Sequence, residues 1–154
     1  MSYNAIISGF DELRQTVTNN GGGKYHLKPN MEEYEKFIGD RKDEFRKLLR
    51  SEGFYFHMTL PQGLEEVQEE AFRDCHRLQS VMFPENLQTI GRAAFFNCIE
   101  LMKLTLKNGL KEIGHHAFDG CTSLIFVTFP EGLQKIGHHA FAKCIYLHSV
   151  KLKN

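Results

Sequence analysis

Residues 106–128 read LKNGLKEIGHHAFDGCTSLIFVT and residues 129–151 read FPEGLQKIGHHAFAKCIYLHSVK, and this stretch decides the fold. Both segments contain the hexapeptide IGHHAF, whose two copies start 23 residues apart, at Ile113 and Ile136. The same spacing separates each of the four cysteines from the next: Cys75, Cys98, Cys121 and Cys144. Self-similarity at a fixed period of this kind predicts a repeat architecture, in which each repeat is one turn of a solenoid.

Two further segments, 60–82 and 83–105, align with these two without a gap, so four full repeats run from residue 60 to residue 151. The shared pattern is (L/F)-P-x-x-L-x-x-(I/V)-G-x-x-A-F-x-x-C-x-x-L-x-x-(V/L)-x, and a fifth, partial copy opens at Leu152. Apolar and polar residues alternate at the end of each repeat, as in half-buried strands. The expected strands, stacked in parallel about 4.8 Å apart, are Leu78–Phe83, Leu101–Leu106, Leu124–Phe129 and Leu147–Leu152.

The other apolar positions recur as well, which predicts further columns of core residues. Leu64 begins a leucine column and Val67 begins a column of Val and Ile. The segment Ala-Phe-x-x-Cys has i, i+1, i+4 spacing, which predicts one short helical turn with these three residues on the core side. The glycine before it, for example Gly114, would permit a tight corner.

This pattern resembles the BspA-like leucine-rich repeats, a 23-residue class with an IG-x-x-AF-x-x-C core followed by L-x-x-(V/I)-x-(L/F)-P. The resemblance covers residues 55–154. It implies an α/β repeat fold, a right-handed leucine-rich-repeat solenoid with a parallel β-sheet on one face. It also implies a role in recognition, and some relatives are surface proteins that bind host proteins. This chain differs from those relatives because it shows no recognisable export signal.

Residues 1–54 differ in composition and are expected to form an N-terminal helical cap region. Asn30 and Glu33 fit an N-cap and an acidic N3 residue, and Gly39 fits a C-terminal stop for this helix. A second helix is predicted from Asp40 to Gly53. Terminal units with a polar outer face cover the open apolar end of a solenoid. A cap is therefore favoured over the alternative, a separate partner-binding helix pair.

The segments on either side of these helices carry weaker signals. Phe10, Leu13 and Val17 are spaced to line a short helix, which Asn19–Gly23 would end. After the cap, the chain aligns with the strand of a preceding repeat, which places three residues in the inward columns: Tyr55, Met58 and Leu60. The solenoid is therefore predicted to occupy residues 55–154.

Charge and hydropathy argue against several classes of function. The 154-residue chain has 19 basic and 19 acidic residues without clustered Lys and Arg, so nucleic acid is not an expected partner. No apolar stretch approaches about 18 residues and no basic amphipathic helix occurs, which argues against a membrane partner. The N-terminus MSYNAIISGFDELRQ does not fit a secretory signal. A cytoplasmic location is expected, or a secreted or cell-surface one if a leader was removed.

The cysteines are the first candidate metal ligands, and their spacing argues against a metal site. Stacked repeats place them in a column of about 5 Å per step, so four of them cannot surround one ion. Parallel Cβ vectors are also poor geometry for disulfides between neighbouring turns. A column of buried thiols is expected instead.

The histidine pairs are the second candidate metal ligands. In the other two repeats their positions hold Glu, Arg or Ala, which predicts that both positions face solvent and are not constrained by the fold. Stacking would place each imidazole beside its counterpart, but the pattern supplies no third ligand. We therefore expect no cofactor, and a metal-dependent activity remains a third hypothesis for His115, His116, His138 and His139.

No catalytic constellation emerges from the repeat. Ser80 and Ser149 lie on predicted strands without a His–Asp pair in register. The adjacent glutamates at 65–66 and 69–70 lie on a polar turn and are interpreted as a solvated face. The chain is therefore not expected to be an enzyme.

The outward positions of the predicted sheet are the candidate binding face, since solenoids present extended surfaces. Phe126 and Met82 belong to two outward columns, and apolar side chains among polar ones are reasonable anchors for a partner. The alternative is that two scattered apolar surface residues need no explanation. The candidate residues for protein binding are His57, Met82, Lys103, Thr105, Phe126, Thr128 and Lys151.

The C-terminal end is a second candidate surface. The last predicted strand holds Val150 and Leu152, and no cap is visible before the chain stops at Asn154. An open strand edge favours pairing, so the end is interpreted either as cut or as the site of a homo-oligomer. The chain is thus predicted to be a non-catalytic protein–protein interaction module, with an adhesin-like surface protein as the alternative.

Overall fold

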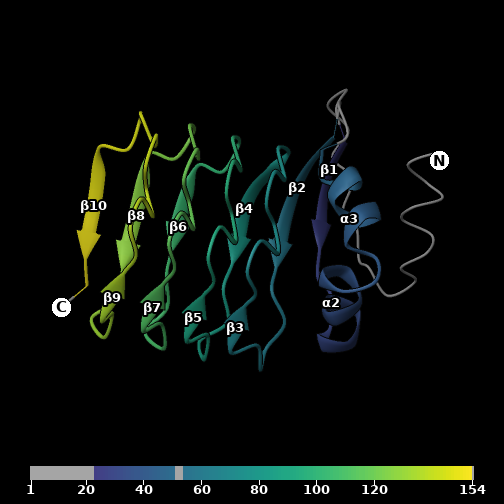
Figure 1. Cartoon of the computed structure of the whole chain (residues 1–154), viewed down its shortest axis with the longest axis horizontal. Helices are drawn as coiled ribbons and strands as arrows, with labels where there is room; N and C mark the ends of the chain where they lie inside the picture. Colours follow the sequence, from purple (N-terminus) through teal and green to yellow (C-terminus); the bar gives the residue numbers. More distant parts are fainter. Residues whose placement is uncertain (1–22, 51–53, 154) are drawn as a thin grey trace.

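The computed structural model describes residues 23–50 and 54–153, which form a solenoid of coils stacked along one axis (Figure 1). One long strand per coil lies on the same side of the molecule. These strands are β1 (Gly23–Leu27), β2 (Phe54–Thr59), β4 (Leu78–Met82), β6 (Lys103–Thr105), β8 (Phe126–Phe129) and β10 (Ser149–Leu152). All paired neighbours are parallel, which confirms the predicted solenoid with a parallel sheet on one face.

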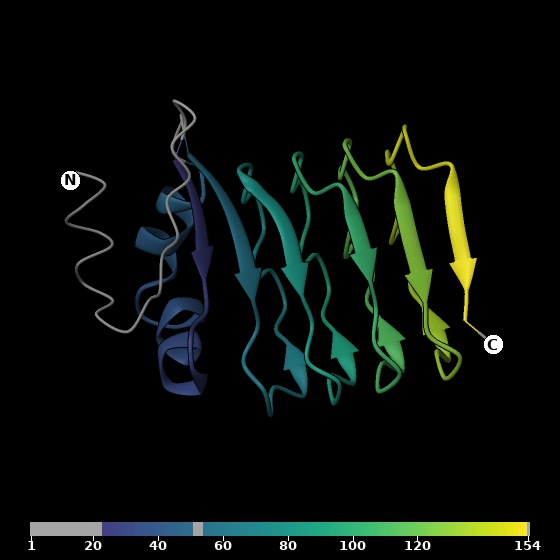
Figure 2. The same cartoon turned by 180° about the vertical axis from the view of Figure 1, so that it is seen from behind.

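The path of the chain gives the solenoid its hand. In Figure 2 the long strands run downward on the near side, the chain returns behind them, and the coils advance from the N-terminus to the C-terminus. This path is a right-handed coil, as expected for parallel strands joined by crossovers.

A second row of short parallel strands lies on another side of the coils. Sequence patterning predicts an inward column here but not a strand. The row is one four-stranded sheet with the order β3 (Glu66–Val67), β5 (Thr89–Ile90), β7 (Glu112–Ile113) and β9 (Lys135–Ile136). Because every repeat has the same length, the same two residues of each coil meet and pair.

The segment from Ala to Cys in each repeat is a series of turns, so the predicted short helical turn is wrong. Asp74, Asn97 and Lys143, which all precede the cysteine of their repeat, have left-handed backbone conformations, with φ of 60°, 63° and 59°, which an α-helix does not accept. The Phe95 N–H instead donates to the Ala117 oxygen of the next coil at 2.8 Å. Hydrogen bonds between coils thus replace those that a helix would make within one.

The conserved glycine of the pattern allows close packing between coils. A Cβ on Gly114 would lie 2.7 Å from the Arg92 nitrogen of the preceding coil, so a side chain does not fit. The glycine is therefore required because two coils approach closely, and not for the tight corner that the sequence predicted. The first repeat has Gln68 at this position, where the helical cap takes the place of a preceding coil. The Tyr34 hydroxyl donates to Gln68 Oε1 at 2.8 Å.

A stack of phenylalanine rings forms the centre of the core. Phe72 and Phe95 have ring centroids 5.1 Å apart, and the next two steps, to Phe118 and Phe141, are 5.3 Å each. The rings are nearly parallel, with interplanar angles of 9°, 3° and 14°. The spacing of the coils therefore sets the stacking distance, which lies in the favourable range for aromatic pairs.

Two helices, α2 (Met31–Ile38) and α3 (Lys42–Leu48), cover the first coil (Figure 1). The predicted capping box is present: the Glu33 N–H donates to Asn30 Oδ1 at 2.9 Å and the Asn30 N–H donates to Glu33 Oε1 at 3.0 Å. The predicted start of the second helix at Asp40 is wrong by two residues. Arg41 is the residue before α3 and makes no side-chain capping bond.

The cap continues the core of the solenoid. The ring of Phe45 in α3 packs edge-on against Phe72 at 6.1 Å and is stacked on Phe37 at 4.5 Å. The backbone also joins the two parts, because the Arg77 N–H donates to the Leu49 oxygen at 2.8 Å. These contacts confirm the predicted helical cap.

Three predictions for the N-terminal region fall on residues outside those that the structure describes. They are the helix with Phe10, Leu13 and Val17, its end at Asn19–Gly23 up to residue 22, and the stop at Gly53. Strand β1 was not predicted; it extends the sheet by pairing with β2.

A register shift in β2 changes which residues face the core. Phe56 lies opposite Leu78 but His57 lies opposite Ser80, so the β4 strand contains one extra residue at this point. Phe56 is therefore fully buried, together with Met58 and Leu60. The prediction of an inward Tyr55 is wrong, and this side chain is half-buried beside the Arg77 guanidinium.

Candidate protein-binding face

The outer side of β2, β4, β6, β8 and β10, here called the sheet face, carries all seven residues predicted to bind a partner. The strand register places Phe126 beside Lys103, and Thr128 beside both Thr105 and Lys151. Neighbouring coils therefore bring side chains of the same repeat position side by side in each of the paired strands.

The predicted anchors differ in accessibility. Met82 is 58% exposed, whereas Phe126 is half-buried. Lys103, Thr105 and Lys151 are exposed and Thr128 is half-buried. Met82 is thus the most accessible apolar group among the predicted residues.

His57 is held in place by its neighbour on the next strand. Its Nδ1 lies 2.6 Å from the Ser80 hydroxyl oxygen, and its side chain is half-buried. The imidazole is therefore a fixed polar element of the sheet face.

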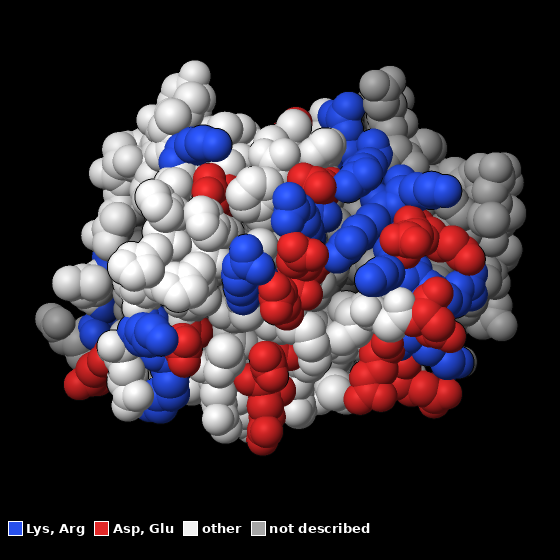
Figure 3. Space-filling model, viewed as in Figure 1, with Lys and Arg blue, Asp and Glu red and all other residues white. Residues whose placement is uncertain are grey.

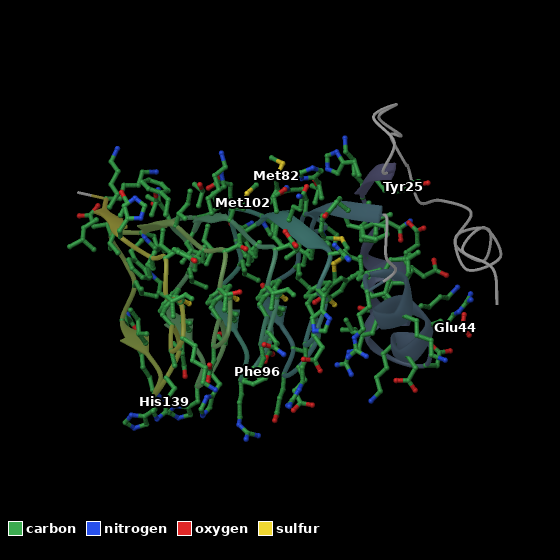
Figure 4. The ribbon with its side chains drawn as sticks, turned by 90° about the horizontal axis from the view of Figure 1, so that it is seen from above. Tyr25, Glu44, Met82, Phe96, Met102 and His139 are labelled. Atoms are coloured by element: carbon green, nitrogen blue, oxygen red, sulfur yellow. The ribbon has the colours of Figure 1, made fainter. Side chains whose placement is uncertain are left out.

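Two apolar residues on this face were missed by the sequence analysis. Met102 is 46% exposed and Ile125 is 43% exposed. They share one repeat position, directly before β6 and β8, and the Ile125 N–H donates to the Met102 oxygen at 2.9 Å. Figure 4 shows Met82 and Met102 on the same side of the ribbon, opposite Phe96 and His139. The sequence could have predicted their exposure, because both residues directly follow the inward leucine of the pattern.

The sheet is interrupted between β4 and β6, where sequence patterning predicts a continuous ladder. The long strands form two sheets, β1-β2-β4 and β6-β8-β10. The Met102 N–H donates to the Gln79 oxygen at 3.3 Å just before β6 begins, but the two described strands are not paired. A cavity of about 370 Å³ lies at this interruption. It is lined by both inward and outward residues of the two strands, including Phe83 and Met82.

Charge distinguishes the sheet face from the side that bears the turns. No residue of the six long strands is an Asp or a Glu. Figure 3, which views the turn side, shows groups of both signs gathered over the cap and the first coils. Two ion pairs there are Arg92–Glu69 at 3.1 Å and Arg73–Glu70 at 2.8 Å. The strands of the sheet face therefore contain no acidic residue, although Glu85, which follows β4, lies 3.8 Å from the Lys107 ammonium group.

The four pattern histidines form two stacked rows on the turn side. His115 and His138 have ring centroids 5.0 Å apart, and His116 and His139 are 5.1 Å apart. The prediction that both positions are unconstrained is wrong for the second one. This position has left-handed φ in every repeat, namely at Glu70, Ala93, His116 and His139.

The histidine rows do not assemble a metal site within the part of the chain that the structure describes. That part contains no group of three or more His, Cys, Asp or Glu side chains placed to hold an ion. Two of the Nδ1 atoms already have partners. His115 Nδ1 accepts from the His138 N–H at 2.7 Å, and His116 Nδ1 lies 2.8 Å from Asp119 Oδ2.

The cysteines form the predicted column of thiols in the core. Cys75, Cys98 and Cys121 are buried and Cys144 is half-buried, and all four are free. The Cys98 thiol donates to the Phe72 oxygen of the preceding coil at 3.1 Å, a contact that sequence patterning did not predict. Burial raises the pKa of the Cys75 thiol to about 12 and that of the Cys144 thiol to about 11. These thiols are therefore structural rather than nucleophilic.

The last coil exposes apolar residues that other coils bury. Ile136 is 48% exposed and Val150 is 54% exposed, whereas Ile113 and Val127 at the same repeat positions are fully buried. A hollow of about 540 Å³ lies at this end, lined in part by the exposed Leu152. No described element packs on this end of the solenoid (Figure 1).

Comparison with protein families decides which repeat this is. The family described as "BspA type Leucine rich repeat region" matches residues 54–154 in six copies. The chain belongs to this family. BspA-type repeats generally form non-enzymatic interaction scaffolds. The comparison with curated proteins found no match. Neither described helix has the length and hydropathy needed to cross a bilayer.

Solved structures of bacterial proteins share the solenoid. A leucine-rich repeat protein from Bacteroides ovatus is 36% identical over 64% of this BspA-type chain, with a TM-score of 0.59. A leucine-rich repeat protein of T. pallidum is 20% identical, with 92% of this chain and 69% of that one covered and a TM-score of 0.62. A leucine-rich cell surface protein from Faecalibacterium prausnitzii is 18% identical, with 90% and 38% covered and a TM-score of 0.63. The last two likenesses concern the fold alone.

The chain is much shorter than the first of these proteins. It spans 25% of the Bacteroides ovatus structure.

Proposed function

We propose that this chain is a non-catalytic protein–protein interaction module that binds another protein through the sheet face. The observation that carries the proposal is that three well-exposed apolar side chains, Met82, Met102 and Ile125, lie on this one face, with Met102 and Ile125 on neighbouring coils. Exposed apolar residues scattered singly are ordinary, whereas a group framed by polar residues is typical of an interaction site. Family membership supports the same role.

The polar residues of the sheet face fit this function. Lys103 and Lys151 place exposed cations beside the apolar group, and the strands contain no acidic residue. Charges around an apolar centre steer association and set specificity more than they add affinity. The expected partner surface is therefore apolar at its centre and acidic at its rim.

Affinity capture from a native lysate of the source organism tests the proposal. The immobilised wild-type chain is compared with Phe126→Ala and Met82→Asp, and with His138→Ala as a matched control on the turn side. A protein that is captured by the wild type and the control but lost with both sheet-face variants supports the proposal. Capture that is equal for all four chains contradicts it, provided that circular dichroism shows the variants to be folded.

An adhesin-like surface role is the second candidate. It is supported by the similarity to the Faecalibacterium prausnitzii protein, whose description places it at the cell surface. Detection of the native protein on intact cells or in the culture medium supports this role, because an adhesin must reach its host partner. Recovery only from the cell lysate rejects it.

The exposed apolar end beside β10 supports a second binding surface. We propose that a second copy of the chain covers the side chains of Ile136, Val150 and Leu152, because these bury apolar area when they meet another such end. Light scattering after size-exclusion chromatography tests this proposal. A dimer that becomes a monomer with Val150→Asp supports it, and a wild-type monomer at about 100 μM overturns it, since stable interfaces give lower dissociation constants.

A further inference from the structure

The cavity between β4 and β6 lies on the sheet face, where the described sheet is interrupted. It has a volume of about 370 Å³, at the lower end of the range for ligand pockets. Its lining includes Ser80, Met82, Phe83, Lys103, Thr105 and Lys107. Here this cavity is called the interstrand cleft.

One structural difference and one sequence difference accompany the cleft. The ladder between coils is interrupted here, whereas β2–β4, β6–β8 and β8–β10 are paired. In addition, Lys107 occupies the repeat position that holds a buried proline in the other three full repeats, at Pro61, Pro84 and Pro130; the partial fifth copy has Lys153 there. A proline at this position would bring no charge to the cleft, whereas Lys107 brings an ammonium group.

The floor of the cleft is apolar. The Phe83 side chain is buried and packs edge-on against Phe95 at 5.9 Å. The Met82 side chain, which also lines the cleft, is exposed, and methionine adapts its shape to apolar partners. The cleft therefore suits one large apolar side chain.

The rim of the cleft is cationic. Lys103 has no ion-pair partner among the described residues. Lys107 has only a long contact to Glu85, at 3.8 Å. Because the six long strands contain no acidic side chain, nothing on the sheet itself competes for these two ammonium groups. A carboxylate from outside is the complementary group.

We propose that the interstrand cleft binds a peptide segment of a partner protein in which a large apolar side chain stands next to an acidic residue. The apolar side chain enters between Met82 and Phe83, and the carboxylate is held by Lys103 and Lys107. The Thr105 hydroxyl lines the same cleft and can hydrogen-bond the peptide backbone, whereas the Ser80 hydroxyl already contacts His57. This inference rests on the proposed function, because it identifies the part of the sheet face that sets specificity.

Selection from a random hexapeptide library displayed on phage tests the inference. The immobilised chain is the target, and the enriched sequence is then synthesised with fluorescein for anisotropy. We expect the selected peptides to share Leu, Met or Phe next to Asp or Glu. Their affinity should fall when the ionic strength rises from about 0.1 M to about 1 M, because the Debye length shortens from about 10 Å to about 3 Å.

Four variants locate the bound peptide. Lys103→Glu and Met82→Ser should each weaken binding at least about tenfold, as expected for residues at the centre of a small interface. Lys111→Glu makes the same charge change at an exposed position outside the long strands, and Ile145→Ser removes an exposed apolar side chain elsewhere. Both controls should bind within about twofold of the wild type.

The outcomes separate this inference from the proposed function. Peptides without acidic residues, or no selected peptides at all, overturn the inference, as does equal binding by Lys103→Glu and the controls. If the lysate partner is still lost with Phe126→Ala in that case, the sheet-face function stands without the cleft. If the lysate partner also ignores the sheet-face variants, the proposed function fails as well.

Discussion

Phe72 in the first repeat and Phe141 in the last occupy the same position of the 23-residue pattern, yet only Phe72 is fully buried. At the first coil, α3 places Phe45 against the stack. At the last coil, the Phe141 ring contacts Phe118 and Phe129, with no described coil beyond it. The same contrast separates Val67, which is buried, from the half-exposed Ile136.

A repeat position therefore specifies whether a side chain points toward the core, but it does not specify how deeply that side chain is buried. In a solenoid each coil contacts only its neighbours. A core residue is therefore completed by the coil or cap on each side, and the stability that it contributes depends on its place in the array.

The largest expected effect comes from removing a ring inside the stack. Phe95→Ala should lower the free energy of unfolding by about 3–5 kcal/mol, because it leaves a cavity between two rings. Phe141→Ala should cost only about 1–2 kcal/mol, because a half-buried ring loses less apolar contact. Urea unfolding followed by circular dichroism measures both. Equal losses would mean that the C-terminal end is covered in solution.

The next effect concerns the position where coils approach most closely. Gly114→Ala should destabilise the chain by about 1–3 kcal/mol, since its Cβ would meet the backbone of the preceding coil at 2.7 Å. At the capped end, Gln68→Ala removes the hydrogen bond from Tyr34 and should cost about 1 kcal/mol. Thermal unfolding of both variants compares the two sites. If Gly114→Ala leaves the unfolding temperature unchanged, the two coils can move apart at this position without losing stability.

Thiol reactivity should also distinguish the ends. Burial raises the pKa of the Cys144 thiol from 9.0 to about 11, and that of the Cys98 thiol rises well above its ordinary value. Cys144 is only half-buried, so native alkylation by iodoacetamide at pH 9 should modify it at least about tenfold faster than Cys98. Mass spectrometry of the tryptic peptides gives the two rates. In urea all four cysteines should react alike.

The same shifts have a consequence for stability against pH. Each thiol has a higher pKa in the folded chain than in the unfolded chain, so the unfolded chain loses its proton first. Below pH 9 the thiols are protonated in both states, and the folded chain keeps its full stability. As the pH rises from 9 towards 11, the folded-state pKa of Cys144, the unfolded chain releases protons that the folded chain retains, and the free energy of unfolding should fall. Denaturant midpoints measured across this range should fall, and a Cys144→Ala variant should show a smaller fall.

The smallest effect is expected at the histidine rows. His115→Ala and His138→Ala should each change the free energy of unfolding by less than about 0.5 kcal/mol, because both side chains are exposed. Elemental analysis of protein purified without a metal column should find no stoichiometric transition metal. Bound metal that disappears in both variants would revive a metal-dependent role.

Sequence patterning predicted the stacked coils, the columns of core residues and the capping box at Asn30. These features follow from local spacing, because a constant period brings the same residue to the same place in every coil. It failed at Tyr55, where a register shift turns Phe56 inward instead. It also failed for the Ala-to-Cys segment, because i, i+1, i+4 spacing is compatible with both a helical turn and successive turns that bond to the next coil.

The candidate site shows the same division. The two outward columns were predictable from alternation along the strands, and the family was recognisable from its motif. The interruption between β4 and β6 could not be predicted from the sequence, because the pairing of two strands depends on how closely their coils approach. The significance of Lys107 in place of proline depends on the cleft that forms beside it.

The spacing of residues along the chain was enough to predict the repeat, its family and, apart from the shifted start of β2, the faces of the strand residues. The tertiary structure was needed to establish which repeats are covered on both sides, where the sheet is interrupted and which apolar residues remain exposed. Burial and cavities arise between neighbouring coils, and no single repeat contains the information about what lies on either side of it.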